Sequence, residues 1–454
     1  LRDYQITGYN WFKNLSHYEF GGILADDMGL GKTIQTITFL LSEQDNHKKS
    51  LIVTPTSLIY NWKSEFENFA PSMNVAVLHG NKEERVEIME NISSYDVILT
   101  TYGTLKNDYE WYDGKEFDYC IIDEAQHIKN SQSISSEIVK EIKAKVKFAL
   151  TGTPIENNLL ELWSIFDFVM PGYLYNKNRF QERFIGTREG TVALKKMIQP
   201  FILRRLKKNV MMELPDKIEK KYYVEMNEEQ KKVYSSYIAD IKEKMNDKDI
   251  NKDKITIFSY LTKLRQLCLD PSVIVEGYNG GSSKIDTALS IVCDAIDAER
   301  KILLFSQFTS VLDNIKKTLK ENNIDYYYLD GATKAQERIK LVNDFNSKDD
   351  VSVFLISLKA GGTGLNLTSA DMVIHFDPWW NPAIEDQATD RAHRFGQKSN
   401  VEVIKLIAKG TIEEKIIKLQ DDKKEVIGEV MNGDYKNGSL LGTLSEEEIK
   451  ELFL

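Results

Sequence analysis

Three short segments, far apart in the chain, carry residue types that can bind and cleave a nucleotide phosphate. The first is DDMGLGKT at residues 26–33, the second is DEAQ at 123–126, and the third is QATDRAHRFGQ at 387–397. A glycine-rich turn can surround phosphates, adjacent carboxylates can hold Mg²⁺ and orient water, and arginines can stabilise charge on a transferred phosphoryl group. Together they indicate an ATPase whose site is closed by a second lobe.

The first segment has the context of a phosphate-binding loop. Apolar residues 22–25 predict a strand before it, and the pattern of residues 32–41 predicts a helix after it. We expect Lys32 to reach the β- and γ-phosphates and the Thr33 hydroxyl to bind Mg²⁺. The pattern G-x-x-x-x-G-K-[ST] has glycine where this chain has Asp26, so a Gly-Lys-Thr turn arising by chance is the competing interpretation. The expected nucleotide-binding residues here are Asp26, Asp27, Met28, Gly29, Leu30, Gly31, Lys32 and Thr33.

The second segment ends an apolar run, residues 119–122, that predicts a buried strand. Carboxylates that follow such a strand lie where open α/β sheets bind ligands. We expect Asp123 to hold Mg²⁺ and Glu124 to polarise the attacking water. The alternative is a solvated strand end.

The third segment contains Arg391 and Arg394, which are three residues apart and would share one face of a helix. We expect them to act on the transferred phosphoryl group. The alternative is a surface charge pair with Asp386 or Asp390.

The rest of the chain predicts two α/β units. Apolar runs alternate with helical patterns, which is typical of parallel sheets covered on both faces. The predicted strands are residues 22–25, 51–54, 75–79, 97–100, 119–122 and 147–150, then 301–305, 326–329, 353–356, 372–376 and 401–406. Residues 157 to about 270 between them have a mainly helical pattern.

Composition narrows the class of protein further. A chain of 454 residues with 42% apolar and 28% charged residues is too long for one core and typical of a globular protein. The three cysteines form no C-x-x-C pair, so neither a disulfide framework nor a zinc site is expected.

The net charge of −10 argues against a general nucleic-acid coat protein but not against a local basic groove. No apolar run approaches the roughly 20 residues of a membrane span. Because Leu1 is not methionine, we expect the chain to be a fragment.

These segments, with others in the same order, resemble the Swi/Snf family of double-stranded-DNA translocases within the superfamily 2 helicase-like ATPases. The matching stretches include LRDYQ at 1–5, LIVTPTSLIYNW at 51–62, IIDEAQHIKN at 121–130, FILRRLKKNV at 201–210 and the block from Ser357 to Gln397. The family usually has an acidic residue at the place of Asp26. Its acidic box usually reads DEAH, so Gln126 is a departure that leaves the coupling made by this residue open.

The resemblance implies two tandem RecA-like lobes with parallel sheets and helical insertions between them. The expected lobes are residues 1–212, with an insertion at about 157–212, and residues 213–454, preceded by an insertion at about 217–275. It implies that Gln5 reads adenine, that Gly364 meets the nucleotide, and that Thr151-Gly152-Thr153 links hydrolysis to nucleic acid. The expected DNA-phosphate contacts are Thr54, Ser57, Thr100, Thr101, Ser357 and Lys359.

The functional hypothesis is therefore an ATP- and Mg²⁺-dependent motor that moves along double-stranded DNA and remodels protein–DNA complexes. We expect a monomeric motor without membrane contact, cytoplasmic and nucleoid-associated in a bacterium, or nuclear in a eukaryote. Its cargo would be a DNA-bound protein such as RNA polymerase. The first alternative is an RNA-polymerase-recycling ATPase of the same family, whose main partner is a protein. The second, from another class, is a strand-separating RNA or DNA helicase, and a non-enzymatic scaffold is the weakest.

Two substitutions test the assigned chemistry. Lys32→Ala removes a charged phosphate contact and is expected to weaken ATP binding about tenfold or more. Glu124→Gln is expected to keep binding and to lower turnover by about 10²–10⁴-fold, because it removes the group that orients water. Nucleotide titration and steady-state hydrolysis measure the two effects. Wild-type turnover in Glu124→Gln would contradict the assignment.

Overall fold

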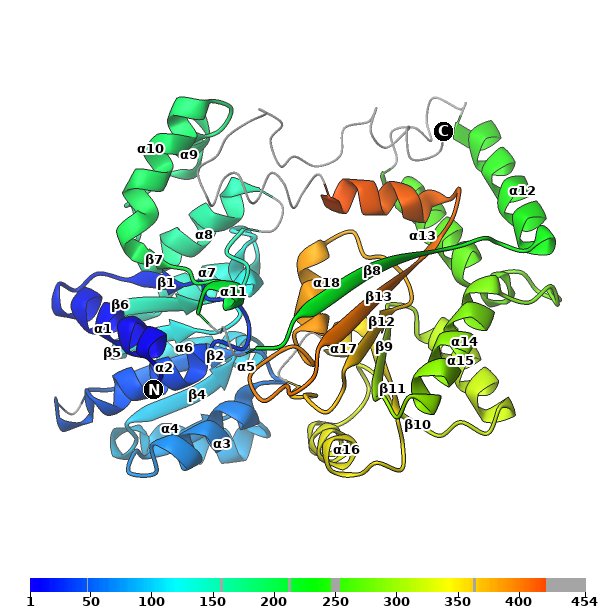
Figure 1. The fold of residues 1–454 in the computed structure, drawn as a ribbon. Coiled ribbons are helices and arrows are strands. Elements are labelled where there is room, and N and C mark those ends of the chain that lie inside the picture. Colours follow the sequence, from blue (N-terminus) through cyan, green and yellow to red (C-terminus); the bar gives the residue numbers. More distant parts are fainter. Residues whose placement is uncertain (47, 156–157, 211–213, 246–253, 362–364, 422–454) are drawn as a thin grey trace. The chain divides into compact units, whose positions relative to one another are not determined.

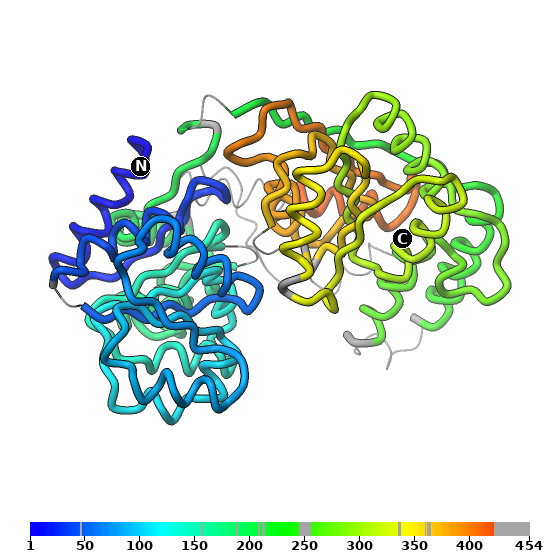
Figure 2. The backbone as a smooth tube through the Cα atoms, turned by 90° about the horizontal axis from the view of Figure 1, so that it is seen from below, coloured from blue at the N-terminus to red at the C-terminus, as the bar shows by residue number. Residues whose placement is uncertain are grey.

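The structure is a computed structural model that describes all residues except 47, 156–157, 211–213, 246–253, 362–364 and 422–454. The chain folds as two compact units, one within Leu1–Met212 and one within Glu213–Lys424. Figure 2 shows the blue to cyan part of the chain in the first unit and the yellow to orange part in the second.

The first unit is built on a seven-stranded parallel sheet with the strand order β3-β4-β2-β5-β6-β1-β7 (Figure 1). Its strands are β1 (Gly22–Leu24), β2 (Ser50–Thr54), β3 (Val75–Leu78), β4 (Val97–Thr101), β5 (Glu116–Ile122), β6 (Lys143–Leu150) and β7 (Ile202–Leu203). Successive side chains of a strand face opposite sides of the sheet. Accordingly, Leu51 and Val53 of β2 join one hydrophobic cluster and Ile52 joins the other.

Helices cover both faces of this sheet. One cluster contains Phe12, Phe39 and Trp62, which come from α1 (Asp3–His17), α2 (Lys32–Leu41) and α3 (Ile59–Phe69). The opposite cluster is covered by α5 (Tyr102–Asn107), α7 (Ile134–Glu141), α8 (Leu159–Val169), α9 (Lys177–Phe184) and α10 (Arg188–Ile198). The remaining helices of this unit are α4 (Lys82–Glu90), α6 (Tyr109–Tyr112) and α11 (Lys207–Val210).

The second unit repeats the design with a six-stranded parallel sheet, ordered β10-β11-β9-β12-β13-β8. Its strands are β8 (Lys217–Val224), β9 (Ile302–Ser306), β10 (Tyr326–Leu329), β11 (Val353–Ser357), β12 (Met372–His375) and β13 (Val401–Ala408). Helices α14 (Ser283–Asp297) and α15 (Thr309–Glu321) pack on one face, and α16 (Ala335–Ser347), α17 (Leu358–Gly361) and α18 (Pro382–Thr389) pack on the other. Helices α12 (Glu228–Met245) and α13 (Lys254–Leu269) form a further cluster with residues after β13.

The prediction of two α/β units with parallel sheets is confirmed, and every strand expected from an apolar run is present. The helical segment expected from about residue 217 begins later, at Glu228, because residues 217–224 form the edge strand β8. Seven of the eight residues of β8 are exposed, so its sequence carries little apolar signal. It is a strand because it pairs along its whole length with β13, from Lys217↔Val401 to Val224↔Ala408.

Within the described residues, no helix combines the length and apolar character that crossing a membrane requires.

A buried histidine ties the sheet of the second unit to α18. His375, at the end of β12, is about 1% exposed, and its Nε2 shares a 2.9 Å hydrogen bond with the Thr389 hydroxyl. Its ring stacks on Phe305 with ring centroids 5.7 Å apart. Burial lowers the pKa of His375 from 6.5 to about 4, against the opposing influence of Glu385. The folded unit therefore holds a neutral imidazole.

Acid should destabilise the second unit through this residue. The unfolded chain binds a proton near pH 6.5 and the folded chain only near pH 4, so the free energy of unfolding falls as the pH drops between these values. The loss should be on the order of 3 kcal/mol. Urea unfolding of the wild type and of His375→Gln at pH 7 and pH 4.5 measures it. An equal pH dependence in both proteins would contradict the prediction.

Candidate active site

The sheet order of the first unit brings three motifs to one edge. Strands β5, β6 and β1 are neighbours, and their carboxyl ends are aligned because Ile122 pairs with Ala149 and Leu24 pairs with Leu150. The acidic pair therefore follows β5, Thr151 follows β6, and the phosphate loop follows β1 at the same edge. A Cβ at Gly152 would lie 3.3 Å from Cγ of Met28, so the third motif packs directly on the loop.

The phosphate loop has the predicted strand-turn-helix form. Gly31 caps α2 in a left-handed conformation, with φ of 76°, which glycine adopts without strain. The ammonium of Lys32 donates to the Asp26 carbonyl at 2.6 Å and so lies against the loop. Gln5 of α1 donates from Nε2 to the Leu30 carbonyl at 3.2 Å, so the expected adenine-reading side chain contacts the loop as well.

The carboxylate of Asp26 is held by the protein itself, and the expected contact of this residue with nucleotide stays a prediction. Its carboxylate is fully buried and paired with Arg205. The side chain of Asp27 accepts a 3.0 Å hydrogen bond from the Lys207 backbone N–H. Both acids therefore bind the protein rather than presenting carboxylates to a phosphate.

The acidic pair is held firmly. Asp123 is 8% exposed and accepts hydrogen bonds from Trp62 Nε1 at 2.8 Å and from the Glu124 backbone N–H at 2.9 Å. The Tyr102 hydroxyl donates to the Asp123 carbonyl at 2.8 Å. Burial, followed by the neighbouring charge of Glu124, raises the pKa of Asp123 to about 7, while the charge of Lys32 opposes this rise.

The donor set of this edge fits Mg²⁺. Two adjacent carboxylates, one of them buried with a raised pKa, favour a cation beside them. Magnesium is commonly bound by one or two carboxylates together with substrate phosphates and water. Asp123 and Thr33 are the residues that would hold it. Among the described residues, no group of three or more His, Cys, Asp or Glu side chains is placed to hold a metal ion by itself.

Gln126 joins the acidic pair to the third motif. Its Nε2 donates to Glu124 Oε2 at 2.6 Å, and its Oε1 accepts from the Thr151 hydroxyl at 2.9 Å. Thr151 Oγ1 accepts in turn from the Thr153 backbone N–H at 3.0 Å. An amide can donate and accept at the same time without titrating. Gln126, which stands where the family usually has histidine, thus bridges Glu124 and Thr151 through two hydrogen bonds.

The two arginines of the third segment belong to the second unit. The expectation that they share a helix face is wrong, since α18 ends at Thr389 and both lie in the turns that follow. Arg391 is buried, and its carbonyl accepts from the Leu367 N–H at 2.9 Å. Arg394 donates to the Leu365 carbonyl at 3.2 Å. Their action on phosphate stays a prediction, and Gly364 lies outside the described residues.

The residues expected to touch DNA are placed in two ways. Ser57 is exposed in the turn before α3. The hydroxyl-bearing side chains of Thr54, Thr100, Thr101 and Ser357 are buried. Thr101 caps α5 by accepting from the Thr104 N–H at 3.0 Å, and Thr100 donates to the Leu78 carbonyl at 3.1 Å. Thr100 and Thr101 therefore fasten the chain near the ends of their strand, and the expected DNA contacts stay a prediction. The side chain of Lys359 is outside the described set.

Three further residues hold this site although no sequence pattern singled them out: Trp62 and Tyr102 contact Asp123, and Arg205 contacts Asp26 of the phosphate loop. Trp62 and Arg205 lie in stretches that carry the family resemblance, residues 51–62 and 201–210. The pattern around Trp62 and Tyr102 is that of ordinary core residues, so it predicts no role in the site. The partner of Arg205 is distant in sequence, so the local pattern does not predict their pairing.

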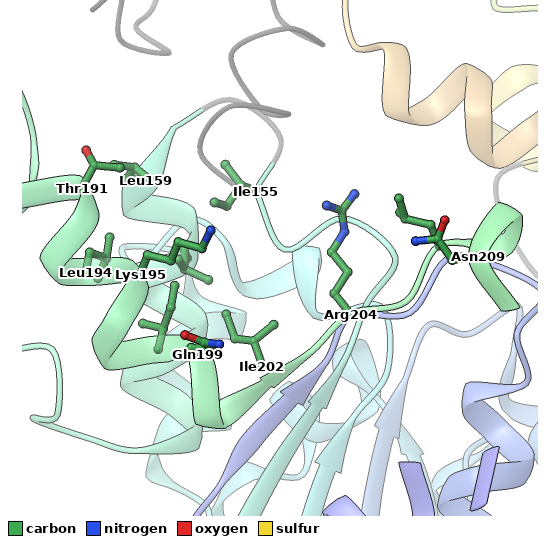
Figure 3. Close-up of a pocket in the computed structure, with 12 residues that line it drawn as sticks. Ile155, Leu159, Thr191, Leu194, Lys195, Gln199, Ile202, Arg204 and Asn209 are labelled. Carbon is green, nitrogen blue, oxygen red and sulfur yellow. The ribbon is translucent and has the colours of Figure 1, made fainter. Parts of the chain in front are cut away.

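The first unit also contains a cavity of about 260 Å³ (Figure 3). It is lined by apolar residues of α8 and α10 together with Lys195, Gln199, Ile202 and Arg204. None of the residues predicted for the nucleotide site lines it, so it is separate from the phosphate loop.

This sheet edge, with its phosphate loop and acidic pair, defines a nucleotide-hydrolysing core of the helicase-like class. The chain belongs to the SNF2-related family: the SNF2-related domain matches residues 4–273, and the helicase conserved C-terminal domain matches residues 283–396. Two RecA-like lobes, the fold class expected for this family, are confirmed by these matches and the two sheets.

Individual relatives agree with this placement. The chain is 43% identical, over its full length, to an uncharacterized ATP-dependent helicase of Mycoplasma genitalium, and 36% identical to a putative ATP-dependent helicase/translocase of Bacillus subtilis. It covers 44% and 50% of these two proteins, about half of their length. A solved structure of a Sulfolobus solfataricus SWI2/SNF2 ATPase core in complex with dsDNA is 38% identical, with a TM-score of 0.48 over 96% of this chain and 93% of that one.

Removal of the Gln126 bridge should slow hydrolysis without weakening nucleotide binding. Gln126→Ala leaves Glu124 and Thr151 without the amide that joins them, and loss of such orientation is expected to lower kcat about tenfold or more. The Kd for ATP should stay near the wild-type value. Gln132→Ala, which truncates an exposed glutamine of the same connection, is the control. Wild-type kcat in Gln126→Ala would show that the bridge has no part in turnover.

Proposed function

We propose that this chain is an ATP-dependent motor that moves along double-stranded DNA and displaces or remodels proteins bound to it. The observation that supports the proposal most directly is the alignment of the phosphate loop, Asp123-Glu124 and Thr151 at one sheet edge of an SNF2-related chain.

In this proposal the residues of the first unit bind and cleave ATP. The loop N–H groups and Lys32 hold the phosphates, and Gln5 contacts the base. Asp123 and Thr33 hold Mg²⁺, which would supply charge neutralisation at the phosphates. Glu124 orients the attacking water, with its carboxylate fixed by Gln126. Arg391 and Arg394 of the second unit stabilise charge that develops in the transition state.

The bridge from Glu124 through Gln126 to Thr151 suggests how hydrolysis is coupled to movement. A change at the carboxylate reaches the loop after β6 through two hydrogen bonds. Contacts to the phosphates of DNA would position the motor without reading sequence. The protein cargo is a DNA-bound protein, such as RNA polymerase, and the motor acts as a monomer.

A comparison of nucleic acids tests this function. Duplex DNA should raise the ATPase rate more than single-stranded DNA or RNA, and the protein should displace the third strand of a triplex. It should leave a blunt duplex paired, because movement along duplex requires no strand separation. Binding should weaken steeply with salt and vary little with sequence.

The Glu124→Gln protein serves as the control for ATP-dependent displacement. Efficient unwinding of a blunt duplex would favour a strand-separating helicase, and stimulation by RNA alone would overturn the proposal.

A further inference from the structure

A short stretch near the end of the first unit runs alongside the phosphate loop. We call residues 203–207 the exit segment, because the first unit ends a few residues later. The Ala25 N–H donates to the Leu203 carbonyl at 2.7 Å, and the Asp27 N–H donates to the Arg205 carbonyl at 3.0 Å. In return, the N–H groups of Arg205 and Lys207 donate to the carboxylates of Asp26 and Asp27 at 3.1 and 3.0 Å. The loop and the exit segment are therefore joined by two backbone–backbone hydrogen bonds and by two bonds from the exit-segment backbone to loop carboxylates.

The side chain of Arg205 joins three parts of the nucleotide site. Its guanidinium pairs with the fully buried Asp26, with Nε 2.8 Å from Oδ1, and donates to Gln35 Oε1 of α2 at 2.7 Å. It also donates to the Tyr4 carbonyl and lies 5.4 Å from the Tyr4 ring centroid. Tyr4 directly precedes Gln5, the expected adenine-reading residue. One arginine thus connects the base side, the phosphate loop and the helix that follows it.

Gln35 extends this cluster to the loop backbone. Its Nε2 lies 3.1 Å from the Gly31 carbonyl and 3.3 Å from the Leu30 carbonyl and from Asp26 Oδ2. Because Gln35 holds these carbonyls toward the protein, the loop N–H groups can point to the opposite side, where a phosphate would bind. Gly8 permits the close approach of α1, since a Cβ there would lie 1.8 Å from Gln35 Oε1.

We propose that Arg205 and Asp26 form a positioning pair that sets the shape of the nucleotide site before ATP binds. This inference rests on the proposed function, and it assigns Asp26 a role other than contact with nucleotide. The guanidinium of an arginine is planar and has several N–H donors, so it can bind a carboxylate, an amide and a carbonyl at once. A lysine ammonium cannot reproduce that geometry. The pair should therefore act on ATP affinity, while the water-orienting Glu124 acts on turnover.

Four variants test the pair: Arg205→Lys, Arg205→Gln, Asp26→Asn and the double variant Asp26→Asn/Arg205→Gln. A fluorescent ATP analogue gives Kd, steady-state hydrolysis gives KM and kcat, and thermal melting reports folding. We expect Kd and KM to rise about tenfold, the loss typical when a group that orients a binding residue is removed. The kcat at saturating ATP should stay within about twofold of the wild type.

A single neutral variant leaves a buried charge unpaired and could prevent folding. Arg205→Lys keeps the positive charge, and the double variant removes both charges of the pair. If the single neutral variants do not fold, the Kd of these two variants is compared with that of the wild type. Arg183→Gln is the matched control and should bind ATP normally. Arg183 is an exposed arginine of α9, and its guanidinium lies over the ring of Tyr175. A folded Arg205→Lys or double variant with wild-type Kd would overturn the inference. A wild type that binds ATP without DNA-stimulated hydrolysis would instead contradict the proposed function.

Discussion

The alignment of β5, β6 and β1 is the constraint on which the rest of the site depends. Parallel strands that share a register release their chains at the same edge of the sheet, so three loops separated in sequence by many residues must meet there. The strands are buried on both faces, and a shift of register would move their apolar side chains to the wrong layer. The hydrophobic clusters of the first unit therefore also fix the place of its phosphate loop and carboxylates.

The carboxylates at this edge each have a defined partner. Asp123 is held by Trp62, Glu124 by Gln126, and Asp26 by Arg205. A buried carboxylate without a partner would be costly, and a mobile one could not orient water or a metal ion. These contacts explain the two residues that depart from the common motifs, Asp26 in the phosphate loop and Gln126 in the acidic box. Asp26 fastens the loop to the exit segment, and Gln126 links the acidic pair to the third motif.

The second unit uses the same sheet design with a different distribution of charge. Ionisable groups that include Lys284 with Glu413 and Lys405 with Glu385 are buried in paired form. Such pairs contribute geometry more than net stability. His375 remains neutral because it is surrounded by packed side chains. The turns that carry Arg391 and Arg394 are anchored by two hydrogen bonds rather than by a helix: the Leu367 N–H donates to the Arg391 carbonyl, and the Arg394 guanidinium donates to the Leu365 carbonyl.

The sequence by itself determined the strands other than β7 and β8, the parallel α/β class and the positions of the phosphate loop and the acidic pair. Buried strands and a strand-to-helix glycine loop are local patterns, so no distant contact is needed to recognise them. The tertiary structure alone decided that residues 217–224 are a strand, because only pairing with β13 holds that exposed, charged segment. It also decided that Thr54, Thr100 and Thr101 face inward and that Arg205 reaches Asp26 across 179 positions of sequence. Side-chain direction and long-range pairing depend on which elements meet, and the pattern of residues along the chain does not encode that in any single segment.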